Sequence, residues 1–352
     1  MSKELSWWLY KDGFKDEDLE YLNDFCPSDI SPTYDMQGWL DLTEQLKKYI
    51  PLGNTLNDHI LYVHKTASDF INYLFDKYVV NDTLLITSVV EHETVEKNIA
   101  RLDRDGKDHI RMHFYNGMKT LNLAQVREVL RVKKYKKAFV YIIGTQITTG
   151  EITPQRFYEK LRSFLIDNGV EPIMVIDDVH GMYMVPRDYS MFDYVICTAH
   201  ALIRRWDMGL MWSKTNEECG YHCCDWLLGY INRLDLIMKC KEKLFQFSNV
   251  MNEELVEYLP YVEYISNSVP NIYSLKVNVP PRFIYSLEEW KEFANLEVRL
   301  ETQNYNKDNI FYIRMRASQY ITFPELLRPA VEKVKKLIEK VILLKEEGYD
   351  RI

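Results

Sequence analysis

The sequence predicts an α/β protein, with a large domain on a mostly parallel β-sheet and a smaller α+β domain after it. Between about residues 84 and 213, short apolar runs rich in β-formers alternate with segments of helical spacing. The strand runs are apolar almost throughout, which is typical of parallel sheets whose two faces are covered by helices. After about residue 215 the alternation stops, and a long helical stretch precedes a mixture of strands and helices.

The individual elements follow from these patterns and from the turn residues between them. In the first part we expect strands at residues 84–90, 110–115, 138–144, 173–177, 192–198 and 208–213, and helices at 123–132 and 154–168. In the second part we expect helix to about residue 259, strands at 273–279, 298–303 and 310–315, and helices at 286–295 and 324–347. We divide the chain into an N-terminal segment packed on the small domain (1–55), the large domain (56–255) and the small domain (256–352).

The composition fits an ordinary globular protein, and 352 residues are enough for two hydrophobic cores. No long basic tract offsets the net charge of -8, which disfavours nucleic acid as a partner without excluding a local patch. No apolar run is long enough to cross a bilayer, and the first residues are too charged for a secretory signal. We therefore expect a cytoplasmic protein with reduced cysteines and no membrane partner.

One cluster of possible metal ligands lies in the second half of the chain: Cys219, His222, Cys223 and Cys224. Common zinc sites pair their ligands at regular spacings, and no second pair follows this one. We interpret the cluster as free thiols at the start of a helix, and we expect no metal site.

Two polar stretches follow successive buried strands. The sequence DDVHG (177–181) comes directly after one strand, and CTAHA (197–201) ends the next. Ligands of parallel sheets bind at the carboxyl ends of the strands, so Asp177, His180, Thr198 and His200 are candidates for a site. Asp and Thr are also favoured in capped turns, and these residues alone leave both interpretations open.

Together these stretches resemble the centre of the fold-type-I pyridoxal-phosphate (PLP) enzymes, the aspartate-aminotransferase superfamily. The cysteine-desulfurase-like and α-oxoamine-synthase-like branches are the most similar. They carry Asp-x-x-His/Gln after one strand, Ser/Thr-x-His-Lys at the end of the next, and then a strand with a glycine. The matching residues here are, in order, Asp177 and His180, Thr198 and His200, and Gly209. The position of the Schiff-base lysine, 24 residues after Asp177, holds Ala201.

Four further stretches fall where this family has functional segments. ITSVVEHETV (86–95) resembles the strand and turn whose histidine, here His92, stacks on the cofactor ring. VHKTAS (63–68) opens a helix at the phosphate loop, although Lys65-Thr66 stand where glycine is common. TTGEITP (148–154) and IRMRAS (313–318) resemble the segment behind the ring and the segment with the substrate-carboxylate arginine. The resemblance covers about residues 60 to 345.

The resemblance implies a role for each matching residue. Asp177 would face the pyridine nitrogen, His92 would stack on the ring and relay a proton, and His180 would contact the phenolic oxygen. The phosphate would be bound by Thr66, Ala67, Ser68, Thr198 and His200. Arg316 would bind an amino-acid carboxylate, with Arg314 as the alternative. An asparagine common in the family is missing, and Gln146 and Thr148 are both open as its replacement.

Ala201 can neither form the Schiff base nor move the substrate's α-proton. Either a lysine was replaced deliberately, which traps a cofactor–substrate adduct, or the protein is naturally lysine-less, as a sugar-modifying or catalytically silent member. We favour the replaced lysine, because the surrounding pattern is intact. The resemblance then implies a homodimeric PLP-dependent transferase or lyase of amino-acid metabolism, such as an aminotransferase, decarboxylase or aldolase-like enzyme. A desulfurase is disfavoured, because no cysteine follows Cys240.

Overall fold

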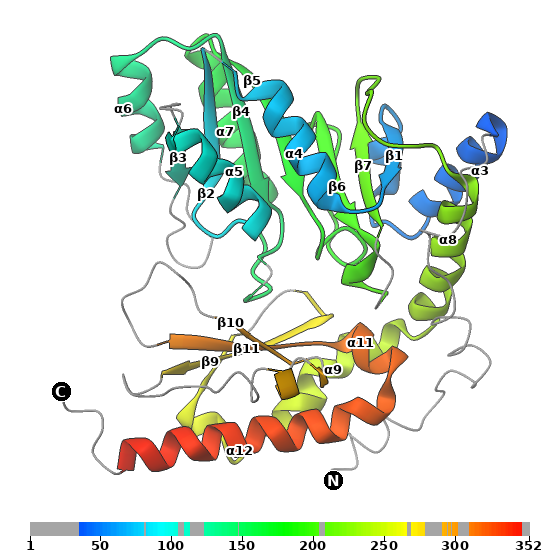
Figure 1. Ribbon diagram of the computed structural model, residues 1–352, viewed down its shortest axis with the longest axis vertical. Helices are drawn as coiled ribbons and strands as arrows, with labels where there is room; N and C mark the ends of the chain where they lie inside the picture. The colour runs from blue at the N-terminus through cyan, green and yellow to red at the C-terminus, as the bar shows by residue number, and fades with distance from the viewer. Residues whose placement is uncertain are drawn as a thin grey trace.

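The protein is built on two β-sheets, seven-stranded in the large domain and four-stranded in the small domain (Figure 1). The computed structural model describes residues 35–80, 82–104, 109–112, 123–146, 148–203, 208–265, 269–278, 291–293, 295–296, 298–301 and 310–346. In Figure 1 the small sheet lies below the ends of the strands of the large sheet, and α8 (Cys224–Lys239) runs between the two domains.

The large sheet has the strand order β1-β7-β6-β5-β4-β2-β3. Its strands are β1 (Ile60–His64), β2 (Thr83–Ser88), β3 (His109–Met112), β4 (Lys137–Ile143), β5 (Glu171–Asp177), β6 (Tyr194–Thr198) and β7 (Gly209–Ser213). The pairings that join β3, β2, β4, β5 and β6 are parallel, whereas β7 is antiparallel to both β6 and β1. The predicted mostly parallel sheet is confirmed. The expected elements lack β1, because no turn signal separates it from the helix that follows.

Helices cover both faces of this sheet, α4 (Ala67–Tyr78) and α5 (Glu93–Arg104) on one, α6 (Ala124–Val132) and α7 (Gln155–Asp167) on the other. Strand β2 shows the alternation directly. Leu85 packs in the cluster that contains α4 and α5, while Leu84 and Ile86 pack in the cluster that contains α6 and α7. This two-sided burial is the physical reason for the continuous apolar strands.

Two helices, α8 (Cys224–Lys239) and α9 (Lys241–Glu254), lead into the small domain. The single helical stretch expected there is interrupted at Cys240. The small sheet is antiparallel, and its strands in spatial order are β10 (Arg299–Glu301), β11 (Ile310–Arg316), β9 (Ile272–Asn278) and β8 (Glu263–Tyr264). The last described elements are α11 (Ala317–Thr322), a short turn of helix (Pro324–Leu326) and the long α12 (Leu327–Glu346).

The described part of the N-terminal segment packs on α8. Its helix α3 (Met36–Lys47) buries Trp39, and the nearby Tyr49 hydroxyl donates to the Asp235 carboxylate of α8 at 3.0 Å. Residues 1–34, residues 113–115 of an expected strand and most of the expected helix at 286–295 lie outside the described residues.

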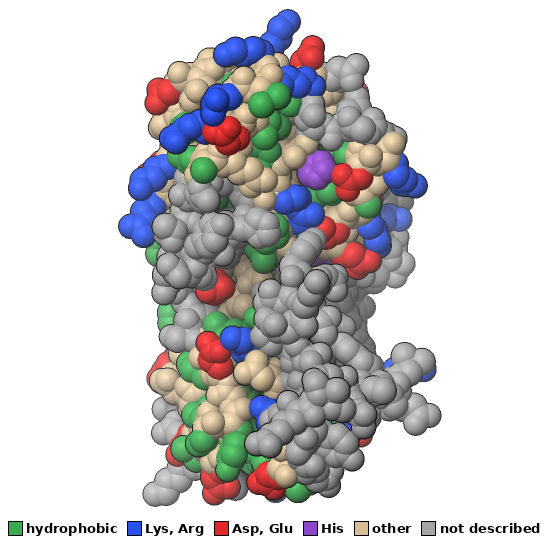
Figure 2. Space-filling view, turned by 90° about the vertical axis from the view of Figure 1, so that its left-hand side faces the viewer, with side chains coloured by type: hydrophobic (Ala, Val, Ile, Leu, Met, Phe, Trp, Pro, Cys, Tyr) green, Lys and Arg blue, Asp and Glu red, His purple; other side chains and the backbone are tan. Residues whose placement is uncertain are grey.

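The charged surface is mixed. Figure 2 shows one face of the molecule, on which Lys and Arg side chains are interspersed with Asp and Glu over the large domain. Among the helices in the described parts of the chain, none has the length and apolar character needed to cross a bilayer.

Candidate active site

A cavity of about 210 Å³ opens where the parallel strands end. Strands β4, β5 and β6 finish at Ile143, Asp177 and Thr198, and all three of these residues line the cavity. This is the edge at which open α/β sheets bind their ligands. The remaining lining residues are Lys65, Thr66, Ala67, Ser68, Ile71, His92, Val179, His180 and Met208.

The structure thus brings most of the sequence-predicted site residues together. Thr66, Ala67, Ser68, His92, Asp177, His180 and Thr198 all line this one cavity, although they lie on four separate segments of the chain. The side chain of His200 lies outside the described residues, and its backbone belongs to a turn of 3₁₀ helix at Ala199–Ala201.

The start of α4 is fixed by a capping box. The Thr66 hydroxyl accepts from the Asp69 amide at 3.3 Å, and the Asp69 carboxylate accepts from the Thr66 amide at 3.2 Å and from the Thr66 hydroxyl at 2.7 Å. His64 adds a contact of 2.6 Å from Nδ1 to the same carboxylate. Capping of this kind defines where a helix begins, and so which first-turn amides face the cavity.

Gly209 lets this helix start lie directly on β7. A Cβ atom at position 209 would come within 2.4 Å of the Ala67 nitrogen and of the Thr66 carbonyl carbon. Since these are backbone atoms, any side chain here would push α4 away from the sheet. The match of Gly209 to the family's third motif therefore has a steric reason.

His92 is exposed and faces the cavity from the loop before α5. Its Nδ1 accepts from the Thr94 amide at 3.2 Å, so the neutral ring carries its proton on Nε2. The Thr94 hydroxyl is also hydrogen-bonded to Ser68, with 2.8 Å between the two oxygens. This contact ties the first turn of α4 to the first turn of α5.

Asp177 is buried, and both carboxylate oxygens have donors. The Tyr141 hydroxyl donates to Oδ2 at 2.8 Å, and the Val179 amide donates to Oδ1 at 3.3 Å. Burial raises the pKa of Asp177 above its usual value, although the Tyr141 hydrogen bond and nearby His92 oppose the shift. A cation brought next to this carboxyl group would favour its ionised form.

A second buried carboxyl group, Glu91, lies close to Asp177. Its Oε1 accepts from the amides of Ser88 at 3.1 Å and Ile143 at 3.2 Å, and from the Ser88 hydroxyl. Ile143 is the partner of Asp177 in the register of β4 and β5, which places the two carboxyl groups near each other. Burial raises the pKa of Glu91 to about 8, and Asp177 adds to the shift.

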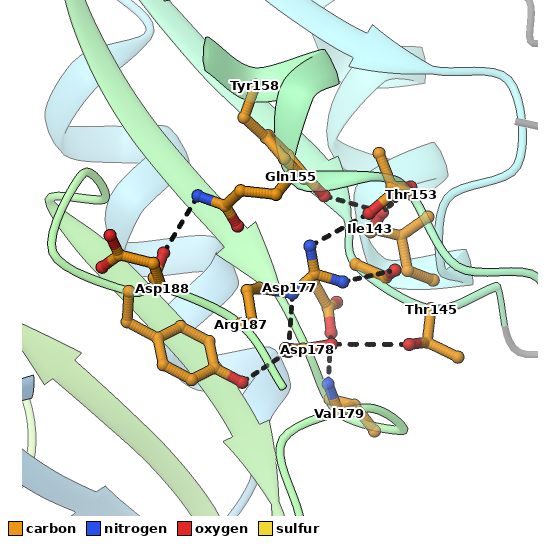
Figure 3. Close-up of polar contacts among 12 residues, drawn as sticks. Ile143, Thr145, Thr153, Gln155, Tyr158, Asp177, Asp178, Val179, Arg187 and Asp188 are labelled. Atoms are coloured by element: carbon orange, nitrogen blue, oxygen red, sulfur yellow. Dashed lines mark hydrogen bonds and ion pairs between the residues drawn. The ribbon is translucent and has the colours of Figure 1, made fainter. Parts of the chain in front are cut away.

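Asp178, the next residue, points into a polar network (Figure 3). Its carboxylate forms an ion pair with Arg187 at 3.1 Å and accepts from the Tyr189 hydroxyl at 2.7 Å. The other two guanidinium nitrogens donate to the carbonyls of Thr153 at 3.0 Å and Gly144 at 3.1 Å. Burial acts to lower the pKa of Arg187, but the charge and hydrogen bond of Asp178 together with the nearby Tyr158 and Tyr189 outweigh it and raise that pKa, which keeps the guanidinium charged.

Sequence reasoning missed Tyr141, Glu91, Asp178 and Arg187 as parts of the site. Tyr141 sits in an apolar run and gives no signal apart from standing two residues before Ile143, on the same face of β4. Glu91 precedes His92 and was visible only as part of the motif. Arg187 lies after the DDVHG stretch, and no common motif predicts an arginine at this spacing.

The small domain approaches the site through Arg316. This residue ends β11, and its Nη1 donates to the Ala201 carbonyl at 3.4 Å. Arg314 lies two residues earlier on the same strand and is buried, with 4% of its surface exposed. Ala201 itself is 2% exposed and does not line the cavity.

Gln146 and Thr148 do not line the cavity either. The Gln146 side chain accepts from the Thr149 hydroxyl within its own loop. The Thr148 carbonyl accepts from the Ser274 hydroxyl of β9, which links this loop to the small domain. Lys65, by contrast, lines the cavity just before the capped start of α4.

The Cys219–Cys224 region has a packing role in the structure. The His222 ring stacks on Trp39 with 5.0 Å between ring centroids, and Cys223 is buried in the core. Within the described ranges, no three His, Cys, Asp or Glu side chains are grouped so as to hold a metal ion.

No protein-family model and no curated protein matches this sequence. Solved structures do match over most of the chain. A NifS-like protein from Rickettsia africae is 14% identical with a TM-score of 0.62, over 95% of this chain and 98% of that one. Serine palmitoyltransferase from Sphingomonas wittichii is 12% identical with a TM-score of 0.57, over 97% and 85%. A PLP-bound C–S lyase from Staphylococcus hominis is 11% identical with a TM-score of 0.62, over 93% and 88%. The chain therefore has the fold of the fold-type-I PLP enzymes, as its motifs predict.

Proposed function

We propose that the cavity binds PLP and that the protein acts on an amino acid as a PLP-dependent transferase or lyase. The observation that carries this proposal is the gathering of seven motif residues from four chain segments around one cavity at the strand ends. Bound PLP supplies the electron sink for breaking a bond at the substrate's α-carbon, while the protein supplies orientation and electrostatics.

The residues present fit this cofactor. The first-turn amides of α4, at Ala67 and Ser68, suit an anion, because helix starts leave such amides without helical partners. Thr66, Thr198 and the neighbouring Lys65 add polar and positive groups at the same cavity. The buried Asp177 carboxyl would hold a protonated ring nitrogen, and that charge would reverse the effect of burial on its pKa. His92 would lie against the ring, and His180 would contact the phenolic oxygen.

For the substrate we propose an amino acid bound through its carboxylate by Arg316. Its guanidinium already reaches the Ala201 carbonyl, so the small-domain strand end lies beside the segment that follows Thr198. The planar guanidinium can hold a carboxylate by two parallel hydrogen bonds. Which bond of the substrate breaks depends on how the bound amino acid is oriented.

For Ala201 we propose that the active form of the protein carries lysine at this position, and that the present chain holds PLP without a covalent bond. The methyl group of Ala201 cannot attack a carbonyl or accept a proton. A chain of this kind would retain a cofactor–substrate adduct and be impaired in turnover.

The test is a comparison of the present chain with Ala201→Lys. We expect PLP to bind both, and only Ala201→Lys to give a yellow, borohydride-reducible attachment of the cofactor to the chain. Mass spectrometry after reduction would locate the attachment. If PLP binds neither protein, the proposed function fails. If PLP binds both proteins and neither is labelled, the proposal that the active form carries its Schiff-base lysine at position 201 fails.

A second candidate is a naturally lysine-less protein, either sugar-modifying or a catalytically silent binding protein. One observation favours it: Ala201 is buried and does not line the cavity. Ala201→Lys would then be poorly accommodated, and it would lose stability without gaining the covalent attachment.

We further propose a two-fold homodimer in the cytoplasm. Two-fold dimers are the commonest closed assemblies, and the described cysteines are all free thiols. Sedimentation at micromolar concentration is the direct check, and a PLP-bound monomer would argue against the dimer.

A further inference from the structure

The Arg187 guanidinium joins three segments of the large domain, two of which directly follow strands that end at the cavity. Its Nε donates to Asp178 after β5, its Nη2 to the Gly144 carbonyl after β4, and its Nη1 to the Thr153 carbonyl before α7 (Figure 3). The side chain is 2% exposed and lies over the Tyr158 ring, with 5.7 Å from its central carbon to the ring centroid. These contacts are therefore shielded from bulk water.

Asp178 is fixed as tightly as its partner. Its Oδ1 lies so close to Gly144 and Gly181 that an added Cβ would come within 2.5 Å and 2.2 Å of it. Its backbone amide donates to the Ile196 carbonyl at 2.9 Å, and its carbonyl accepts from the Gly181 amide at 3.1 Å. The turn after β5 is thus closed around one carboxylate.

The same turn carries cavity residues on its other side. Neighbouring side chains along an extended chain point to opposite sides, so Asp178 faces Arg187 while Asp177 faces Tyr141. The Asp177 carbonyl accepts from the Gly144 amide at 2.7 Å, next to the carbonyl that Arg187 holds. A shift of the ion pair would therefore move Asp177, Val179 and His180 together.

A buried ion pair is a poor source of net stability, because desolvation of both charges offsets most of their attraction. Its contribution here is geometric, because the planar guanidinium donates hydrogen bonds in three fixed directions, to Asp178, Thr153 and Gly144. Functional side chains need such fixed supports behind them.

We propose that Arg187 and Asp178 are positioning residues, whose ion pair holds the turn after β5 so that Asp177 and His180 meet the ligand in the cavity. Neither residue lines the cavity, so the pair acts through its neighbours. The identity of that ligand, PLP, rests on the proposed function above.

The experiment compares the full-length protein with Arg187→Met, Asp178→Asn, the double variant and Arg187→Lys. PLP is titrated into each cofactor-free protein, and the absorption and induced circular dichroism of bound PLP are recorded at saturation. Leu165→Ala is the matched control, because Leu165 is buried in α7 near the opposite edge of the sheet and its loss lowers stability there.

We expect each single change to weaken PLP binding by roughly tenfold or more and to alter the circular dichroism of the bound ring. Arg187→Lys should recover only part of the affinity, since one ammonium group cannot reach all three acceptors. The double variant should lose less than the sum of the single losses, because neither charge is then left alone. Leu165→Ala should lose stability with unchanged affinity and spectrum.

Two results would overturn the inference. One is that Arg187→Met or, if it does not fold, Arg187→Lys binds PLP with the affinity and spectrum of the unchanged chain. The other concerns hydrogen exchange in the ligand-free proteins, which does not depend on PLP. Unaltered protection of residues 177–183 in the Arg187 variants would show that the pair does not hold the turn. Failure of the unchanged chain to bind PLP would instead refute the proposed function, and the exchange data would still decide the positioning role.

Discussion

At the scale of single residues, the site contains two sets of side chains. One set lines the cavity, and the other contacts the first set and fixes its position. Asp177, His92 and His180 line the cavity, whereas Tyr141, Thr94 and Asp178 hold or adjoin them. The sequence points to the first set because their types and spacing match a known pattern. The second set is dispersed in apolar runs and loops, so only the fold reveals it.

Arg316 and Arg314 can be separated by experiment. If Arg316 binds the substrate carboxylate, Arg316→Ala should weaken amino-acid binding by roughly 2–5 kcal/mol, the usual loss for one partner of a buried charge pair. Arg314→Ala should change it far less, because Arg314 lies inside the small domain. The check is a spectral titration of the PLP-bound proteins with amino acids, limited to variants that are folded and keep the PLP affinity of the unchanged chain. Small and equal effects would favour a substrate without a carboxylate.

At the scale of elements, the anion-binding side of the cavity depends on how closely α4 approaches β7. The capping box fixes the first residue of the helix, and Gly209 fixes its distance from the sheet. The sequence predicts a helix start near residue 66. It does not show that a glycine in β7 allows this helix start to lie against the sheet.

Gly209→Ala should therefore weaken PLP binding. The new methyl group would lie 2.4 Å from the Ala67 nitrogen, so the helix start must move away from the phosphate position. We expect a loss of roughly tenfold or more in affinity, in line with the effect of misplaced supporting groups, measured by PLP titration. Gly169→Ala is the control: it strains a left-handed turn at φ +73° with no atom within 4 Å of the new Cβ. If Gly209→Ala binds PLP with normal affinity, the position of the start of α4 does not determine PLP binding.

At the scale of the whole molecule, two buried carboxyl groups at the site make the stability depend on pH. Glu91 binds its proton more strongly in the folded protein, because burial raises its pKa from the ordinary value of 4.5 to about 8. Below pH 4.5 Glu91 is protonated in both the folded and the unfolded chain, so its contribution to stability is fully present. As pH rises towards 8, the unfolded chain loses this proton first, so stability falls.

Glu91→Gln should remove this part of the fall. Without added PLP, the difference in unfolding free energy between Glu91→Gln and the unchanged chain should shift in favour of the variant from about pH 5 to pH 8. Above pH 8 this difference should stay constant. The shift corresponds to roughly 3–5 kcal/mol at most. Urea unfolding at pH 5, 7 and 9 measures it, with the exposed Glu159→Gln as control. Parallel curves for Glu91→Gln and the unchanged chain would mean that Glu91 is ionised in the folded protein.

The sequence by itself determined the fold class, the strand ends that carry the site and the seven residues that now share a cavity. Apolar periodicity sets which segments are buried strands, and the ends of parallel strands meet at one edge, which accounts for the fold class and for Asp177, His180 and Thr198. The other four residues, Thr66, Ala67, Ser68 and His92, came only from the resemblance of their segments to the fold-type-I PLP enzymes. Only the tertiary structure decided that β1 joins the sheet, that Ala201 is buried without lining the cavity, and that Arg187 ties three loops together. These depend on contacts between residues far apart in the chain, which local pattern does not encode.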